Sequence, residues 1–114
     1  MIELSEERIR ELISRAEEML HMSYSPYTHF HVGAALLASN GSIYTGCNVE
    51  NAALAGGSCA ERTAIVKAVS EGVRSFTAIA ITGGRGGVPG GICAPCGVCR
   101  QVMREFCDPD TFRV

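Results

Sequence analysis

The chain has 114 residues, of which 46% are hydrophobic and 19% are charged, so one globular domain over residues 1–114 is expected. The net charge of -2 and the pI near 5.9 disfavour a nucleic-acid partner, since duplex-binding domains usually have a pI above about 9. No apolar run approaches the roughly 18 residues of a membrane span, and the acidic N-terminus does not resemble a signal peptide. We therefore expect a cytoplasmic protein without membrane contact.

The first predicted element is an amphipathic helix that begins after Ser5, a candidate N-cap. Glu6 and Glu7 suit the positive end of its dipole. Its apolar residues recur at helical spacing and are Ile9, Leu12, Ile13, Ala16, Met19 and Leu20. We expect this stripe to pack on a sheet. A loop, indicated by Ser25-Pro26, follows the helix.

A β-hairpin is predicted next. Residues 31–38 form an apolar, extended run, and residues 42–47 return as the second strand. Between them, Asn40-Gly41 favours a two-residue hairpin turn.

Helices and strands then alternate. A second helix is predicted to open after Ser58 and stop near Gly72. Residues 76–82 are rich in isoleucine and alanine and predict a strand buried on both faces. A third helix is expected between Pro95 and Asp108.

Residues 111–114 look like the start of a fourth strand. The complete order is therefore α-β-β-α-β-α-(β). This order predicts a mixed sheet with helices packed on it.

Three cysteines have the spacing of a catalytic zinc site. Cys96 and Cys99 form a C-x-x-C pair after Pro95, so both sulfurs point one way from the first turn of a helix, and Cys59 adds a third thiolate. Three thiolates bind Zn²⁺ and leave one tetrahedral position open, as a catalytic zinc requires. Glu61 lies near enough to serve that position without coordinating. Zinc deaminases combine the same two segments, with the glutamate as proton shuttle.

Two alternative roles for these residues stay open. Ser58-x-x-Glu61 is also a helix capping box, which would account for Glu61 without any chemistry. Cys93 together with the three cysteines above would complete a closed Cys₄ zinc site, which would abolish catalysis. Pro95 argues against the closed site, because Cys93 precedes the start of the helix that carries the other pair.

The chain resembles the small homotetrameric cytidine deaminases of free nucleosides over nearly its whole length. The similar segments are residues 24–27, 30–36, 46–52, 59–64 and 95–102. The resemblance implies an α/β/α sandwich with a mixed central sheet, and we expect this chain to lack the last strand of the family. It also implies one Zn²⁺ per chain, a homotetramer and a place in pyrimidine salvage.

The resemblance also implies roles for five further residues. Asn48 and Glu50 would hydrogen-bond the ribose hydroxyls, Phe30 would pack on the pyrimidine, and the backbone around Ala60 would bind the cytosine amide edge. Arg62 would compensate the charge of the thiolates. The residues by themselves also fit simpler roles, namely an exposed polar strand end, a core aromatic and a surface arginine.

The implied reaction is hydrolytic deamination of cytidine or deoxycytidine to the uridine product and ammonia. Zn²⁺ would activate a water, and Glu61 would carry protons to the base. Two departures from the family concern the substrate. Leu54 stands where the family commonly has an aromatic, and the double glycine of residues 55–57 resembles blasticidin-S deaminase. A related cytosine nucleoside therefore stays open as the substrate, as does a non-catalytic closed zinc module.

Overall fold

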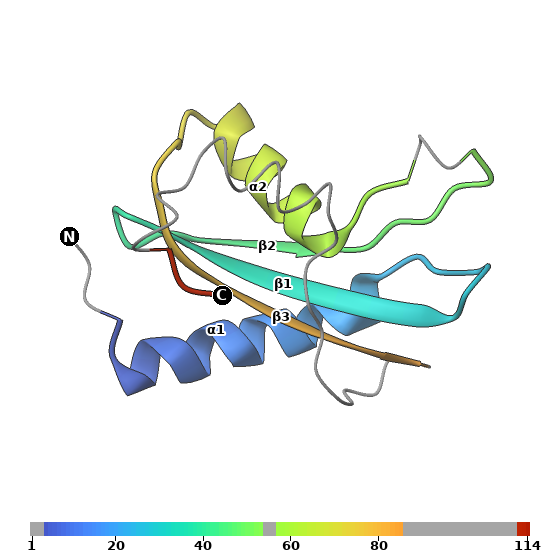
Figure 1. The fold of residues 1–114 in the computed structure, drawn as a ribbon, viewed down its shortest axis with the longest axis horizontal. Coiled ribbons are helices and arrows are strands. Elements are labelled where there is room, and N and C mark those ends of the chain that lie inside the picture. The colour runs from blue at the N-terminus through green and yellow to red at the C-terminus, as the bar shows by residue number, and fades with distance from the viewer. Residues whose placement is uncertain (1–3, 54–56, 86–111) are drawn as a thin grey trace.

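The computed structural model describes residues 4–53, 57–85 and 112–114. The expected third helix, Leu54, Cys93 and the Cys96–Cys99 pair lie outside these ranges. In chain order the elements are α1 (Glu6–Glu18), the 3₁₀ helix η1 (Met19–Met22), β1 (Phe30–Ala38), β2 (Ile43–Cys47), α2 (Ala60–Ser70) and β3 (Phe76–Arg85). The strand order is β2-β1-β3, and α1 and α2 cover opposite faces of the sheet (Figure 1). Among these elements no helix is long and apolar enough to cross a membrane.

Helix α1 packs on one face of the sheet as predicted, but only part of the predicted stripe is buried. Ile9 and Ile13 are 39% and 44% exposed, and Met19 and Leu20 belong to η1 rather than to α1. The hydroxyl of Ser5 accepts a hydrogen bond from the Arg8 backbone N–H at 3.2 Å, which confirms the N-cap. Leu12 and Ala16 are buried. The core on this face contains Leu12, Ala16, Ala35, Leu37 and Ala78. A Cβ at Gly33 would lie 2.0 Å from the Ala16 carbonyl oxygen, so only glycine lets β1 approach the end of α1 this closely.

The β1–β2 hairpin is antiparallel, with Gly33 opposite Cys47. The predicted two-residue turn is wrong, because the backbone N–H of Ala38 donates to the Ser42 carbonyl oxygen at 2.9 Å and leaves a three-residue loop between them. Gly41 ends this loop with φ 93°. A three-residue hairpin commonly ends in a left-handed residue, and glycine adopts that conformation without steric cost.

Strand β3 pairs antiparallel with β1 and extends three residues beyond the predicted end. Residue Arg113 pairs with it in the parallel direction, opposite Ala78. The Ile79 N–H donates to the Arg113 carbonyl oxygen at 2.8 Å, and the Arg113 N–H donates to the Thr77 carbonyl oxygen at 3.1 Å. These bonds form an isolated parallel bridge where the fourth strand was expected, beside the three-stranded antiparallel sheet of the described residues.

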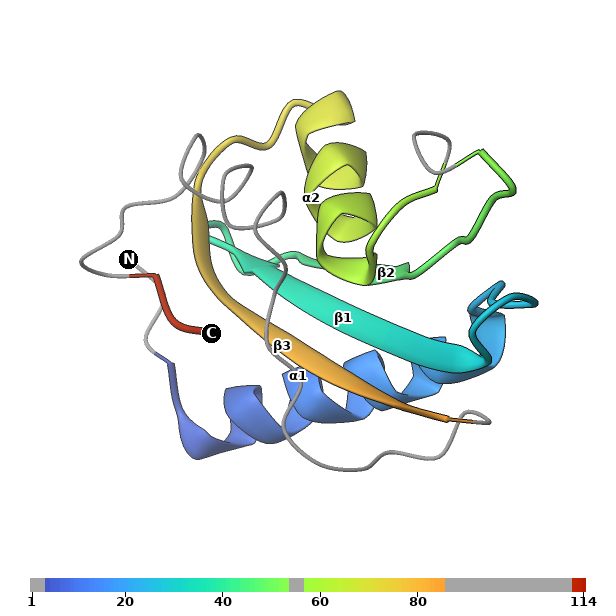
Figure 2. The same cartoon turned by 45° about the vertical axis from the view of Figure 1, so that its right-hand side comes forward.

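Helix α2 covers the other face of the sheet (Figure 2). The core beneath it is made of small and aliphatic side chains around one phenylalanine: Ala34, Leu36, Ala38, Ala60, Ala64, Ile65, Ala68, Phe76 and Ile79. Gly46 of β2 lies against the first turn of α2, and a Cβ there would lie 2.4 Å from the Ala60 carbonyl oxygen. The two helical layers confirm the α/β/α arrangement and place the N-terminus of α2 at the end of β2.

Candidate active site

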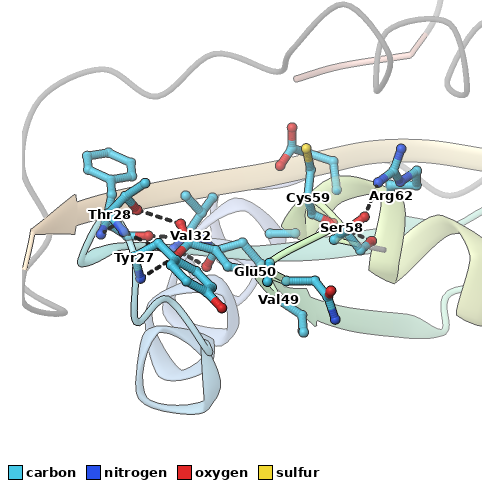
Figure 3. Close-up of a pocket in the computed structure, with 15 residues that line it drawn as sticks. Tyr27, Thr28, Val32, Val49, Glu50, Ser58, Cys59 and Arg62 are labelled. Atoms are coloured by element: carbon cyan, nitrogen blue, oxygen red, sulfur yellow. Dashed lines mark hydrogen bonds between the residues drawn. The ribbon is translucent and has the colours of Figure 1, made fainter. Parts of the chain in front are cut away.

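A cavity of about 720 Å³ is formed by the loop before β1, the segment after β2 and the first turn of α2 (Figure 3). Its size is typical of a small-molecule site. Every predicted site residue within the described ranges lines it, namely Phe30, Asn48, Glu50, Cys59, Ala60, Glu61 and Arg62. Residues from three separate parts of the sequence therefore share one pocket.

Backbone pairing at Val49 brings these three parts together. On one side Val49 exchanges two hydrogen bonds with Ser58, at 2.9 and 2.8 Å. On the other side the Tyr24 N–H donates to the Asn48 carbonyl oxygen at 3.1 Å, and the Glu50 N–H donates to that of Tyr24 at 2.8 Å. The segment after β2 is thus held between the loop before β1 and the start of α2.

The first turn of α2 begins one residue later than a capping box would require. Cys59, not Ser58, is the N-cap residue, and no side chain caps this helix end within the described part of the chain. The Ser58 hydroxyl instead contacts the Thr63 hydroxyl at 2.9 Å, and Thr63 donates to the Cys59 carbonyl oxygen at 3.0 Å. The capping role of Glu61 is therefore wrong.

Glu61 and Cys59 place a carboxylate and a sulfur on the α2 side of the cavity. The Glu61 side chain is only 4% exposed, and Cys59 is half-buried. Glutamate is rarely buried to this extent unless it is paired. The N–H groups at a helix N-terminus favour negative charge, so the position suits both a carboxylate and a thiolate.

The donor set fits zinc as far as it is described. A half-buried cysteine at a helix N-terminus, facing a cavity, is a suitable thiolate ligand. The described ranges hold no cluster of three metal-ligating side chains, and the other two predicted ligands, Cys96 and Cys99, lie outside them. The set of Cys59, Cys96 and Cys99 therefore stays a prediction.

Glu50 lies on the opposite side of the cavity and is held by three hydrogen bonds (Figure 3). Its Oε1 accepts from the backbone N–H groups of Tyr27 at 3.0 Å and Thr28 at 3.2 Å, and its Oε2 accepts from the Thr28 hydroxyl at 2.5 Å. The Thr28 hydroxyl bond, aided by the two N–H bonds and by nearby His29, lowers the pKa of Glu50, while desolvation opposes this change. Glu50 is thus fixed as a carboxylate.

Sequence reasoning missed Tyr27 and Thr28. Their main contribution comes from backbone N–H groups, which every residue except proline possesses, so residue type gives no signal. The turn signal at Ser25-Pro26 located this loop but not the direction of its N–H groups.

Asn48 joins the same side of the cavity to β1. Its Oδ1 accepts from the Val32 N–H at 2.9 Å and from the Ser23 hydroxyl, and its Nδ2 donates to the Phe30 carbonyl oxygen at 2.9 Å. One N–H of Nδ2 remains for a ligand once this bond is counted. The predicted ribose contact therefore stays a prediction, beside an observed structural role.

The observed positions of Phe30 and Arg62 do not match a core aromatic and a surface arginine. Phe30 is 40% exposed and lines the cavity, so it is not a core aromatic. Arg62 is half-buried, and its Nη2 donates to the Gly57 carbonyl oxygen at 2.6 Å. This bond holds the segment before Cys59 against the helix and keeps the guanidinium beside the cavity. Contact between Arg62 and the thiolates stays a prediction.

Residues 6–113 match the family model of the cytidine and deoxycytidylate deaminase zinc-binding region, so the chain belongs to this family of zinc-binding deaminases. Its relatives include the cytidine deaminase of Sporosarcina psychrophila, 50% identical over 100 residues that make up 88% of this chain and 71% of the relative. The cytidine deaminase of Halalkalibacterium halodurans is 48% identical over 101 residues, which cover 88% of this chain and 73% of that protein.

The fold is also that of solved cytidine deaminases. The crystal structure of cytidine deaminase from Burkholderia pseudomallei superposes with a TM-score of 0.78 at 43% identity. The match covers 90% of this chain and 77% of that one. The family resemblance inferred from the sequence is thereby confirmed, and with it a zinc-dependent hydrolase that acts on a C–N bond.

Proposed function

We propose that this protein hydrolyses cytidine and deoxycytidine to uridine and deoxyuridine with release of ammonia. The carrying observation is the buried carboxylate of Glu61, which shares a cavity of nucleoside size with Cys59 and Glu50. We propose cytidine rather than blasticidin S as the substrate because the relatives at 50% and 48% identity are named cytidine deaminases. The same names favour an enzyme over a closed zinc module.

We infer one Zn²⁺ per chain, held by the thiolates of Cys59, Cys96 and Cys99. When bound, Zn²⁺ lowers the pKa of a water toward about 7 and so supplies the nucleophile. The chain supports this charge in two ways. The N–H groups at the start of α2 favour charge on the Cys59 sulfur. Arg62 adds a positive charge at the same end of the cavity.

The positions of the side chains support the other proposed roles. Glu61 takes a proton from the attacking water and passes it to N3 of the base. It then takes the second proton from the hydroxyl added at C4 and gives it to the amine, which leaves as ammonia while the C4 carbonyl forms, so one carboxylate acts as base and as acid. The Ala60 N–H belongs to the first turn of α2, where N–H groups have no intrahelical acceptor, and it is available to the cytosine amide edge. Phe30 packs on the pyrimidine, and Asn48 and Glu50 bind the ribose hydroxyls.

We further propose a homotetramer that works in the cytoplasm in pyrimidine salvage. Four apolar side chains near the cavity are 40% to 60% exposed, namely Tyr24, Tyr27, Phe30 and Val49. Such a group of exposed apolar side chains favours a protein interface. Thiolate ligands also need a reducing compartment. Light scattering at micromolar concentration tests the assembly, and a monomer would contradict it.

The deciding experiment follows the loss of cytosine absorbance with cytidine as substrate. We expect turnover that a chelator abolishes and added Zn²⁺ restores, with one zinc per chain by elemental analysis. Cys93→Ser should retain that zinc and the activity. Absence of turnover by zinc-loaded protein would refute the proposed function, and loss of zinc in Cys93→Ser would favour the closed Cys₄ site.

A further inference from the structure

We propose that Thr28 is a positioning residue that aims the carboxylate of Glu50 at a single sugar hydroxyl. This inference rests on the proposed function, because the contact of Glu50 with the sugar is itself part of that proposal.

The Thr28 hydroxyl joins the two substrate-facing residues directly. It has one proton to donate and lone pairs to accept. It donates to Oε2 of Glu50 at 2.5 Å, and it accepts from the backbone N–H of Phe30 at 3.1 Å. The bond from the Phe30 N–H holds the Thr28 hydroxyl in place, and its one proton is donated to Oε2 of Glu50.

The bond to Phe30 also closes an unusual stretch of backbone. It spans His29, which has a left-handed φ of 61°. Histidine is among the residues that adopt this conformation more readily than most. In this turn the N–H groups of Tyr27 and Thr28 donate to Glu50, and the N–H of Phe30 donates to the Thr28 hydroxyl.

Counting acceptor sites limits what Glu50 can recognise. A carboxylate has about four lone-pair positions, two on each oxygen. Both positions of Oε1 are used by the two backbone N–H groups, and one of Oε2 is used by the Thr28 hydroxyl. One position on Oε2 remains, so Glu50 accepts from one sugar hydroxyl. Ribose and 2′-deoxyribose, which both keep a 3′-hydroxyl, satisfy it equally.

The test measures binding of the reaction product, which does not depend on turnover. Isothermal titration of the zinc-loaded protein with uridine, 2′-deoxyuridine and 2′,3′-dideoxyuridine separates the hydroxyl contact from base stacking. Thr28→Val keeps the shape and removes the hydroxyl, while Thr28→Ser restores the hydroxyl. Glu50→Gln removes the acceptor charge. Ser39→Ala, which removes a hydroxyl paired with Ser75 outside the cavity, is the matched control.

We expect Thr28→Val to weaken binding of uridine and 2′-deoxyuridine about tenfold, in the range for a hydrogen bond to a charged group. Binding of the dideoxy ligand should change less than about twofold. Thr28→Ser and Ser39→Ala should bind like wild type. In the Glu50→Gln background, Thr28→Val should add no further loss, because the two residues act through one contact.

Equal weakening of all three ligands in Thr28→Val, or failure of Thr28→Ser to restore binding, would overturn the inference and leave Thr28 as a loop residue. Wild-type protein that binds uridine and dideoxyuridine equally would also overturn it, without affecting the proposed reaction. Wild-type protein that prefers uridine but does not deaminate cytidine would refute the proposed function alone.

Discussion

The two sides of the cavity are built by different means. On the α2 side, Cys59 and Glu61 are placed by packing, because Gly46 lets the helix backbone touch β2 and the surrounding side chains are buried. On the loop side, Glu50 is placed by three hydrogen bonds from exposed residues. Packing holds the groups proposed for chemistry, and hydrogen bonds hold the group proposed for recognition.

This difference predicts different consequences of substitution. A close-packed element transmits a displacement to everything that it carries, since an interior has little space to absorb it. An exposed hydrogen bond can be lost with the fold intact. Changes on the α2 side should therefore affect turnover, zinc and stability, whereas changes on the loop side should affect binding of the sugar.

The largest effect is expected for Glu61→Gln. The amide has the same shape but cannot take up the proton, so turnover should fall by at least about 10²–10⁴-fold while zinc and fold are retained. Cytosine absorbance, elemental analysis and circular dichroism measure the three quantities. Glu71→Gln, on the exposed C-cap of the same helix, is the control and should act like wild type. Substantial turnover by Glu61→Gln would refute its role as proton shuttle.

Gly46→Ala tests the packing of α2. The new methyl would lie 2.4 Å from the Ala60 carbonyl oxygen and 2.6 Å from the Ala64 nitrogen, so the first turn must move. We expect a loss of about 1–3 kcal/mol in the free energy of unfolding and reduced zinc retention. Urea denaturation and zinc analysis measure these effects.

Gly72→Ala is the matched comparison for Gly46→Ala. Gly72 has φ 93° but no atom within 4 Å of an added methyl group, so its cost of about 1 kcal/mol comes from backbone conformation alone. Zinc retention and turnover should be unchanged. Equal loss of zinc in both variants would show that α2 responds to general destabilisation rather than to displacement of its first turn.

Acidification should weaken sugar binding by the loop side of the cavity. The Glu50 pKa lies below its ordinary value of about 4.5, chiefly through the Thr28 hydroxyl, with His29 as the neighbouring titratable group. A lowered folded-state pKa means that Glu50 stabilises the fold above its ordinary pKa and that this contribution disappears as pH falls through the lowered value. Uridine affinity should fall by about tenfold over the same range.

Glu50→Gln isolates the titrating group in this pH experiment. Its uridine affinity should be weaker at neutral pH and should not change as pH falls, because the amide does not titrate there. Titration calorimetry from neutral pH downward, limited to conditions in which circular dichroism shows folded protein, compares the two. If uridine affinity falls equally with pH in Glu50→Gln, the titrating group is not Glu50.

The smallest effect is expected for Arg62. Arg62→Gln removes a positive charge near Cys59 and the bond to the Gly57 carbonyl oxygen. Zinc loss to a coloured chelator should accelerate by a factor of about two to five, as for other partly screened charges. Arg62→Lys keeps the charge and should lose zinc more slowly than Arg62→Gln. Equal rates in these two variants would assign the role of Arg62 to the Gly57 bond rather than to charge.

The two α-helices and three strands of the described residues, and the family's chemistry, could be predicted from the sequence alone. Side-chain periodicity located α1 and the hairpin, because apolar residues must face the core. The spacing of Cys59 and Glu61, read with the later cysteine pair, indicated a zinc deaminase, because this chemistry needs these side chains. Such features depend on residue type, which the sequence states directly.

How these groups are held depends on the tertiary structure. The N-cap of α2 is Cys59 rather than the predicted Ser58, and the hairpin loop has three residues rather than the predicted two. Both features depend on backbone dihedral angles and on pairing with distant strands. The N–H groups that fix Glu50 come from a loop more than 20 residues earlier in the chain, and pairing of Tyr24 with Val49 brings that loop beside the carboxylate. Every residue except proline carries the same N–H group, so its direction is set by the fold and not by the side chain.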